Sequence, residues 1–98
     1  MELYLVDGMI KNAEAMTDQI MEEHKAYTQK AMDHGMTLMA GLKSDMSGAV
    51  FLMKGQTQDE IEAYLANEPF KKHGIQEYKI TKFEAHFIQS SMEQWKDA

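Results

Sequence analysis

Residues 36–54, MTLMAGLKSDMSGAVFLMK, contain two apolar segments separated by a polar loop. The segments Met36–Leu42 and Ala49–Lys54 have the length and composition of strands, and the loop of residues 43–48 has the glycine and polar residues of a turn. We therefore predict that the two segments pair as an antiparallel hairpin. The second segment is apolar at successive positions, so both faces of that strand carry apolar side chains.

Two further strands are predicted outside this hairpin. Leu3–Val6 forms the first strand, and the Asp-Gly pair that follows is typical of a turn. The last strand is an extended stretch from Ile75 to Ile88. Its alternation of apolar and polar residues changes phase between Ile80 and Phe83, which indicates a bulge or a break at that point.

Two helices are predicted between the strands. The first covers residues 12–33 and ends at Gly35; its apolar residues recur at three- and four-residue steps and are Ala13, Met16, Ile20, Tyr27 and Ala31. A capping box over Thr57–Glu60 begins the second helix. That helix stops near Asn67, because Pro69 disfavours helical backbone at the residue before it.

The predicted order of elements is β-α-β-β-α-β within one α+β domain, residues 1–88. Right-handed connections place both helices on one face of a four-stranded antiparallel sheet, which is the ferredoxin-like arrangement. Residues 89–98 form a polar tail that contains Met92 and Trp95. We expect this tail either to form a short docking helix or to fray.

The apolar residues predict a partner for the sheet. Two helices cover one face, yet residues 49–53 and Leu3–Val6 are apolar on both faces. A second copy of the chain, packed sheet to sheet, is the simplest cover for the other face. We therefore predict a homodimer through the sheet face, with a barrel-like centre.

Composition excludes several classes of function. The formal net charge of −6 argues against nucleic acid, which is bound by basic surfaces, and the absence of cysteine excludes disulfides and thiolate chemistry. The first residues lack the basic flank of a signal peptide, and no apolar run approaches the roughly 18 residues of a membrane span. We expect a cytoplasmic protein that binds neither nucleic acid nor membrane.

His24 is the first candidate for chemistry, because it lies on the apolar row of the first helix between Ile20 and Tyr27. Histidine is the commonest general acid or base, although a core histidine bonded to a backbone carbonyl fits the same pattern. Glu68 is its natural partner, since the constrained turn before Pro69 can aim a carboxylate inward. A carboxylate bonded to one imidazole nitrogen raises the basicity of the other, whereas a glutamate at a helix end is more often solvated.

The other residues point to no metal or cofactor. His34 is expected at a helix end and His73 in a surface turn, while His86 is expected on the face of the last strand opposite to Ala85 and Phe87. No two histidines have the spacing of metal ligands. No glycine-rich phosphate loop is present. The ten methionines fit either core packing or the lining of an adaptable pocket.

Short motifs along residues 2–87 resemble those of the YciI-like family. That family has a His in the first helix, an Ala-Gly-Pro step at the end of the second strand, Asp-Pro-Phe or Asp-Pro-Tyr followed by Gly, and a closing strand motif. The matching residues here are His24, Ala40-Gly41-Leu42, Glu68-Pro69-Phe70 with Gly74, and Thr81-Lys82-Phe83.

The resemblance implies a dimeric α/β barrel with an active site in a cleft between helices and sheet. By position, His24 is the catalytic imidazole and Glu68 the carboxylate, and the ligand pocket beside them includes Tyr27, Gly41 and Phe70. Where the family has Arg, Asp and Pro, this chain has Met21, Glu68 and Leu42.

Three functions follow as hypotheses from these patterns. The first is a cofactor-free enzyme of lyase or isomerase type, in which His24 transfers a proton on a small cyclic metabolite. The second is a module on the same dimeric fold that binds a small ligand without chemistry. The third is an interaction subunit that uses the Met92–Trp95 tail.

Overall fold

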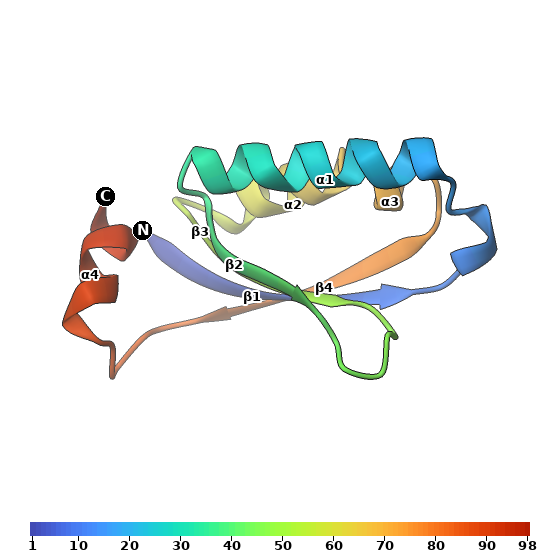
Figure 1. The fold of residues 1–98 in the computed structure, drawn as a ribbon. Helices are drawn as coiled ribbons and strands as arrows, with labels where there is room; N and C mark the ends of the chain where they lie inside the picture. The colour runs from blue at the N-terminus through green and yellow to red at the C-terminus, as the bar shows by residue number, and fades with distance from the viewer.

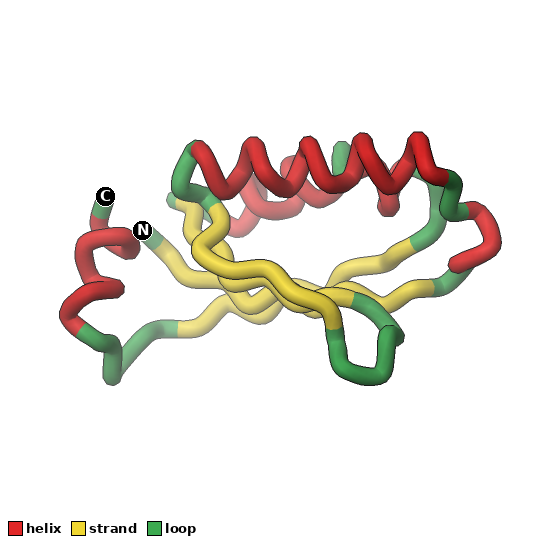
Figure 2. The backbone as a smooth tube through the Cα atoms, in the orientation of Figure 1, coloured by secondary structure: helices red, strands yellow, loops and turns green.

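The computed structural model describes residues 1–98 and has a helical layer on one face of a sheet (Figure 1). The elements in chain order are β1 Glu2–Ile10, a 3₁₀ turn Ala13–Ala15, α1 Asp18–Asp33, β2 Thr37–Leu42, β3 Ala49–Gly55, α2 Gln58–Ala66, α3 Pro69–Lys72, β4 Gln76–Phe83 and α4 Ser90–Asp97. Figure 2 shows α1, α2 and α3 together on one side of the strands, and α4 apart from them at one end.

The four strands form one antiparallel sheet in the order β2-β3-β1-β4. β1 is central, and its Val6 lies opposite Phe51 of β3 and Ile80 of β4. The connections from β1 to β2 and from β3 to β4 carry the helices that cover the sheet. This is the predicted ferredoxin-like α+β fold, and the predicted hairpin of β2 and β3 is part of it.

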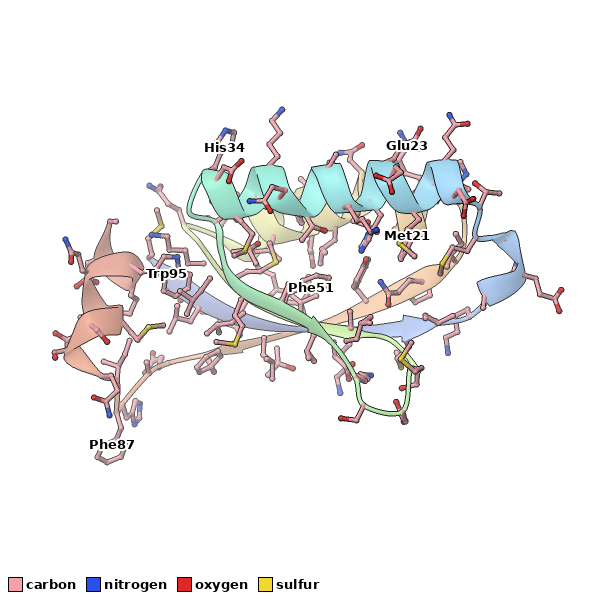
Figure 3. The ribbon with its side chains drawn as sticks, in the orientation of Figure 1. Met21, Glu23, His34, Phe51, Phe87 and Trp95 are labelled. Atoms are coloured by element: carbon pink, nitrogen blue, oxygen red, sulfur yellow. The ribbon has the colours of Figure 1, made fainter.

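The core lies between the sheet and the helices. Alternate residues of β1 and β3 point toward the helical layer, because side chains in a strand alternate between faces. The main buried cluster consists of Tyr4, Val6, Ala49, Phe51, Met53, Ile61 and Leu65. Figure 3 shows Phe51 in the space between the strands and α1.

The first helix begins later than predicted. The side chain of Thr17 accepts a hydrogen bond from the Ile20 amide at 3.2 Å and so caps α1. Residues 13–15 form a separate 3₁₀ turn, and Met16 between the two is extended. The end of α1 is as predicted: Gly35 has a φ of +78°, a left-handed conformation that glycine adopts without strain.

Two strand predictions were wrong. β1 continues through Asp7 and Gly8 to Ile10, because these residues pair with β4 instead of turning. β4 ends at Phe83, and its register with β1 has no bulge. The alternation of apolar and polar residues changes phase at Phe83 because Phe83 lies on the open face of the sheet, and that face is itself apolar. An apolar residue of β4 can therefore lie on either face. The irregularity in the sheet lies in β2, between Thr37 and Met39.

The sheet face opposite α1 is largely open. Its exposed apolar side chains are Leu5, Met9, Met39, Val50 and Phe83. Only one end of this face is covered, by α4: the Trp95 indole donates to the Gly35 carbonyl at 2.9 Å, and the Lys54 ammonium bonds the Trp95 carbonyl. Phe87, in the segment before α4, projects away from the molecule (Figure 3).

None of the helices is long and apolar enough to cross a membrane.

The loop between β2 and β3 closes tightly on β1. The Ile10 amide donates to the Ser47 carbonyl at 2.8 Å, and a Cβ added at Gly48 would lie 1.8 Å from the Gly8 carbonyl oxygen. We expect Gly48→Ala to lower the free energy of unfolding by about 1–3 kcal/mol, because the backbone must move to admit the methyl group. Urea denaturation of both proteins measures this difference.

Gly41→Ala is the matched control, because a Cβ at Gly41 meets nothing within 4 Å. Equal stabilities for the two variants would contradict the close approach of the hairpin loop and β1.

Candidate active site

His24 and Glu68 meet between α1 and the start of α3. The imidazole Nδ1 is hydrogen-bonded to Glu68 Oε1. The ring of Phe70 stacks on the imidazole, with centroids 3.8 Å apart and planes 2° from parallel. The His24 side chain is 16% exposed and the Glu68 side chain 2%. The carboxylate is therefore enclosed, while one edge of the imidazole remains accessible.

The local sequence explains why Glu68 points inward. Glu68 is the N-cap of α3, and its Oε2 accepts from the amides of Phe70 at 2.9 Å and Lys71 at 3.2 Å. Pro69 occupies the first position of α3, where its missing N–H removes no helical hydrogen bond. The same Pro69 that ends α2 therefore begins α3, a short helix that the sequence analysis did not predict.

Two side chains of β4 complete the surroundings of the carboxylate. Tyr78 donates its hydroxyl to Glu68 Oε2 at 2.7 Å, and Gln76 donates to the Tyr78 oxygen at 2.8 Å. Gly8 gives them room, since a Cβ there would lie 2.9 Å from the Gln76 side chain and 3.0 Å from the Tyr78 ring. Burial and then the Glu68 carboxylate raise the pKa of Tyr78, so its hydroxyl remains a donor.

This arrangement determines which imidazole nitrogen of His24 carries the proton. A carboxylate oxygen only accepts, so we assign the Nδ1 proton to the bond with Glu68. The other nitrogen, Nε2, then carries the lone pair and can take a proton from a ligand. Glu68 stabilises the imidazolium that results, as the carboxylate does in a Ser-His-Asp triad.

A cleft beside His24 separates α1 from the hairpin of β2 and β3. It has a volume of about 420 Å³, and its lining is His24, Lys25, Thr28, Gln29, Ala40, Gly41, Leu42, Ala49 and Phe51. We call it the His24 cleft. The helix contributes the polar side chains and the two strands contribute a mostly apolar wall, which is the composition of a small-ligand site.

The three predicted pocket residues have different places. Gly41 lines the His24 cleft. Phe70 is buried behind the imidazole and is not part of the lining. Tyr27 lines a separate cavity of about 210 Å³ with Tyr64, on which its ring stacks at 4.7 Å. Its hydroxyl donates to the Tyr64 carbonyl at 2.7 Å.

The remaining histidines lie away from this site. His34 follows the last residue of α1 and His73 the last residue of α3. His86 is exposed and 3.5 Å from the Glu84 carboxylate. A larger cavity of about 640 Å³ lies between the ends of β1 and β4 and α4, but its lining contains no histidine. No three side chains of the metal-binding types come together in a possible metal site.

Tyr78, Gln76 and Thr28 belong to the site but were not predicted. Gln76 and Tyr78 alternate on the helix-facing side of β4, and Thr28 follows His24 by one helical turn. Periodicity did not single out any of the three. It gave no sign that the face of β4 lies against Glu68, because that contact depends on the path of α3.

The comparison with family models identifies the chain. The model of the YCII-related domain matches residues 1–84. The chain therefore belongs to the YCII-related family, as the motifs around His24 and Glu68 predicted. No curated protein matches it.

Two solved structures share the fold. One is 5-chloro-2-hydroxyhydroquinone dehydrochlorinase of Burkholderia phenoliruptrix AC1100, in complex with 2,5-dihydroxybenzoquinone. It is 16% identical with a TM-score of 0.64, over 84% of this chain and 93% of that chain. The other is an antibiotic biosynthesis monooxygenase, 14% identical with a TM-score of 0.56, over 87% of this chain and 98% of that chain.

The raised pKa of Tyr78, caused first by burial and then by the Glu68 carboxylate, predicts how stability depends on pH. Folding raises the pKa of this phenol above its ordinary 10.0, so the folded protein keeps the proton at pH values where the unfolded chain has lost it. The contribution to stability is complete below about pH 10 and is lost as the pH rises through the raised pKa.

We expect Tyr78→Phe to cost about 1–3 kcal/mol at neutral pH, because Glu68 loses a buried donor. We also expect the variant to lose less stability than the wild type as the pH rises above about 10, because it lacks the phenol that loses its proton there in the unfolded chain but keeps it in the folded protein. Urea unfolding at a series of pH values measures both effects. The same dependence on pH in the two proteins would contradict the assignment.

Proposed function

We propose that this protein is an acid/base enzyme centred on His24, which transfers a proton on a small cyclic metabolite bound in the His24 cleft. The observation that carries the proposal is the hydrogen bond between His24 Nδ1 and the buried Glu68 carboxylate. It leaves Nε2 as the nitrogen available to a ligand, and the cleft borders that histidine. A positioned base of this kind contributes about 10²–10⁴-fold to a reaction rate.

In this mechanism Nε2 removes a proton from the bound ring compound. The imidazolium is stabilised by Glu68, whose other oxygen keeps its bonds to the α3 amides and Tyr78. The same nitrogen returns the proton at another atom in an isomerisation, or keeps it while a leaving group departs in an elimination. Phe70 holds the imidazole plane during both steps.

Two observations support a ring compound without a strong negative charge. The apolar wall formed by Ala40, Ala49 and Phe51 suits the face of a small ring. Met21, where the family has Arg, lies on the sheet-facing side of α1 and offers no charge to an anion (Figure 3). Lys25 is the one cation in the lining of the cleft, and its ammonium lies 3.8 Å from the Glu22 carboxylate. The similarity of fold to a dehydrochlorinase bound to a dihydroxybenzoquinone points to hydroxylated rings as the first compounds to test.

The second candidate is a binding module without chemistry on the same fold. The replacement of the family's Arg by Met21 favours it, because an anchor for substrate is missing. The contact between His24 and Glu68 favours the enzyme, because a ligand-binding cleft alone does not need a buried carboxylate behind its histidine.

The test begins with a thermal-shift screen of quinones, hydroxylated aromatic compounds and lactones. A ligand at 100 times its dissociation constant adds about 2.7 kcal/mol to the folded state, which raises the melting temperature measurably. Each hit is then incubated with the wild type and with His24→Ala, and turnover is followed by chromatography. We expect the variant to be about 10²–10⁴-fold slower.

His86→Ala is the matched control, because His86 is exposed and outside the cleft. Turnover that is unaffected by His24→Ala would refute the mechanism. Binding without turnover in the wild type would favour the binding module.

We also propose that the open sheet face forms a homodimer. Leu5, Met39 and Val50 are 45%, 63% and 37% exposed on that face, a cluster of the kind that marks an interface. We expect light scattering at micromolar concentration to give twice the chain mass of 11.3 kDa, and Leu5→Lys to give the single mass. Met32→Lys, on α1, controls for added charge and should leave the mass unchanged.

A monomeric wild type would remove the dimer from the proposal. The cytoplasmic location expected from the sequence stays a prediction.

A further inference from the structure

The outer edge of β2 is exposed and carries no charge. β2 is a terminal strand of the sheet, and its residues 39–42 are all exposed. Its sequence, TLMAGL, contains neither a charged residue nor a proline. Edge strands in proteins are usually protected from pairing by charges, prolines or bulges. The bulge of β2 lies at its start, between Thr37 and Met39, so residues 39–42 have none of these protections.

The other edge of the sheet is protected. β4 carries the charged residues Glu77, Lys79 and Lys82, and the Lys71 ammonium pairs with the Glu77 carboxylate beside that strand. A strand added at β4 would have to displace or bury these charges. The two edges of one sheet therefore differ, and only β2 offers an uncharged backbone for pairing.

The hydrogen-bond ladder shows which groups of β2 are available. The Lys43 amide donates to the Gly48 carbonyl at 2.9 Å, which fixes the phase of the ladder between β2 and β3. Since successive residues of an antiparallel strand bond to alternate sides, Gly41 bonds to β3, and Ala40 and Leu42 direct their N–H and C=O groups outward. No loop of the chain bonds to these outward groups.

These backbone groups border the His24 cleft. Ala40, Gly41 and Leu42 line the cleft from the β2 side, and the Leu42 side chain is 69% exposed there. A strand laid between β2 and α1 would bond to the outward groups of β2. Because side chains in a strand alternate between faces, every second side chain would lie against the apolar wall of the cleft.

The helices decide what kind of strand fits. α1 packs over β2 (Figure 1). Two copies of the chain paired through β2 would have their α1 helices above strands about 4.8 Å apart. Packed helices need about 8–10 Å between their axes, so the two helices would collide. An extended segment without a helix above it has no such conflict.

Charge favours a basic segment. The formal net charge of the chain is −6, which attracts cations to its surface. Lys25 is the one cation that lines the cleft, and Glu22 lies 3.8 Å from it. The groove therefore opposes a basic peptide only weakly.

We propose that the groove between α1 and β2 binds an extended segment of another protein by strand addition. The segment has apolar side chains at alternate positions and basic side chains between them. Its backbone bonds to Ala40 and Leu42, and its apolar side chains lie against the cleft wall. The inference goes beyond the proposed function, because it rests on the backbone of β2 and not on the imidazole of His24.

The test uses a hexapeptide of alternating valine and lysine, acetylated and amidated at its ends, with NMR of the protein amides. When about 90% of the protein is bound, the amides of Ala40 and Leu42 should exchange with solvent about tenfold more slowly, because exchange then occurs mainly from the unbound tenth. The amide of Gly41 should change little, because it already bonds to β3. The amides of β4 provide the internal control and should be unaffected.

Ala40→Pro removes an outward donor without removing a bond to β3, and proline is tolerated at such positions of edge strands. We expect the variant to bind the peptide roughly three- to tenfold more weakly, the contribution of one hydrogen bond. Ala40→Gly keeps the N–H and should bind like the wild type. Circular dichroism checks that both variants are folded.

A second comparison changes only the peptide and so leaves the fold of the protein intact. The same hexapeptide with every amide N-methylated keeps its side chains and charge but cannot donate, and it should bind at least about three- to tenfold more weakly. A hexapeptide of alternating valine and glutamate should also bind more weakly than the lysine peptide.

Three results would overturn the proposal. The first is no binding of the lysine peptide, or binding without protection of Ala40 and Leu42. The second is equal binding of the methylated or the glutamate peptide. The third is protection of the two amides that grows with protein concentration when no peptide is present, since the partner would then be a second copy of the chain.

Discussion

The buried carboxylate of Glu68 holds the site together. It accepts from two amides of α3, from Tyr78 of β4 and from His24 of α1, so three elements converge on one charged group. Removing such a group from water is unfavourable unless several donors replace the solvent. The position of α3 and the aromatic stack on His24 both follow from this requirement. The fold therefore fixes the imidazole through its Nδ1 atom, and the other edge of the ring stays free at the His24 cleft.

The arrangement of the sheet could be predicted because its signals are local. The polar loop of residues 43–48 separates two strand-length apolar runs, and Thr57 begins α2 where the capping box placed it. His24 could be found by its place in the helical row, and Glu68 by its place before Pro69. The extent of β1 could not be predicted, because an Asp-Gly pair is typical of a turn. Only the pairing with β4 shows that Asp7 and Gly8 belong to the strand.

The parts that sequence did not predict depend on contacts between distant segments. Tyr78 meets Glu68 only because α3 returns the chain toward β4, and Gly8 must lack a side chain for Gln76 and Tyr78 to fit. Tyr27 shares the helical row with His24 but belongs to another cavity, because its partner is Tyr64 of α2. Periodicity indicates which face of a helix or strand is buried, but it does not indicate which residue of another element that face contacts.

The packing of α4 determines which part of the structure the intrinsic tryptophan fluorescence reports on. Trp95 is the single tryptophan of the chain; its indole bonds the Gly35 carbonyl, and the Lys54 ammonium lies 5.1 Å from the ring centroid. The indole therefore senses the contact of the tail with the end of α1 and not the packing between sheet and helices. Emission spectra follow the attachment of the last helix, and circular dichroism follows the rest of the fold.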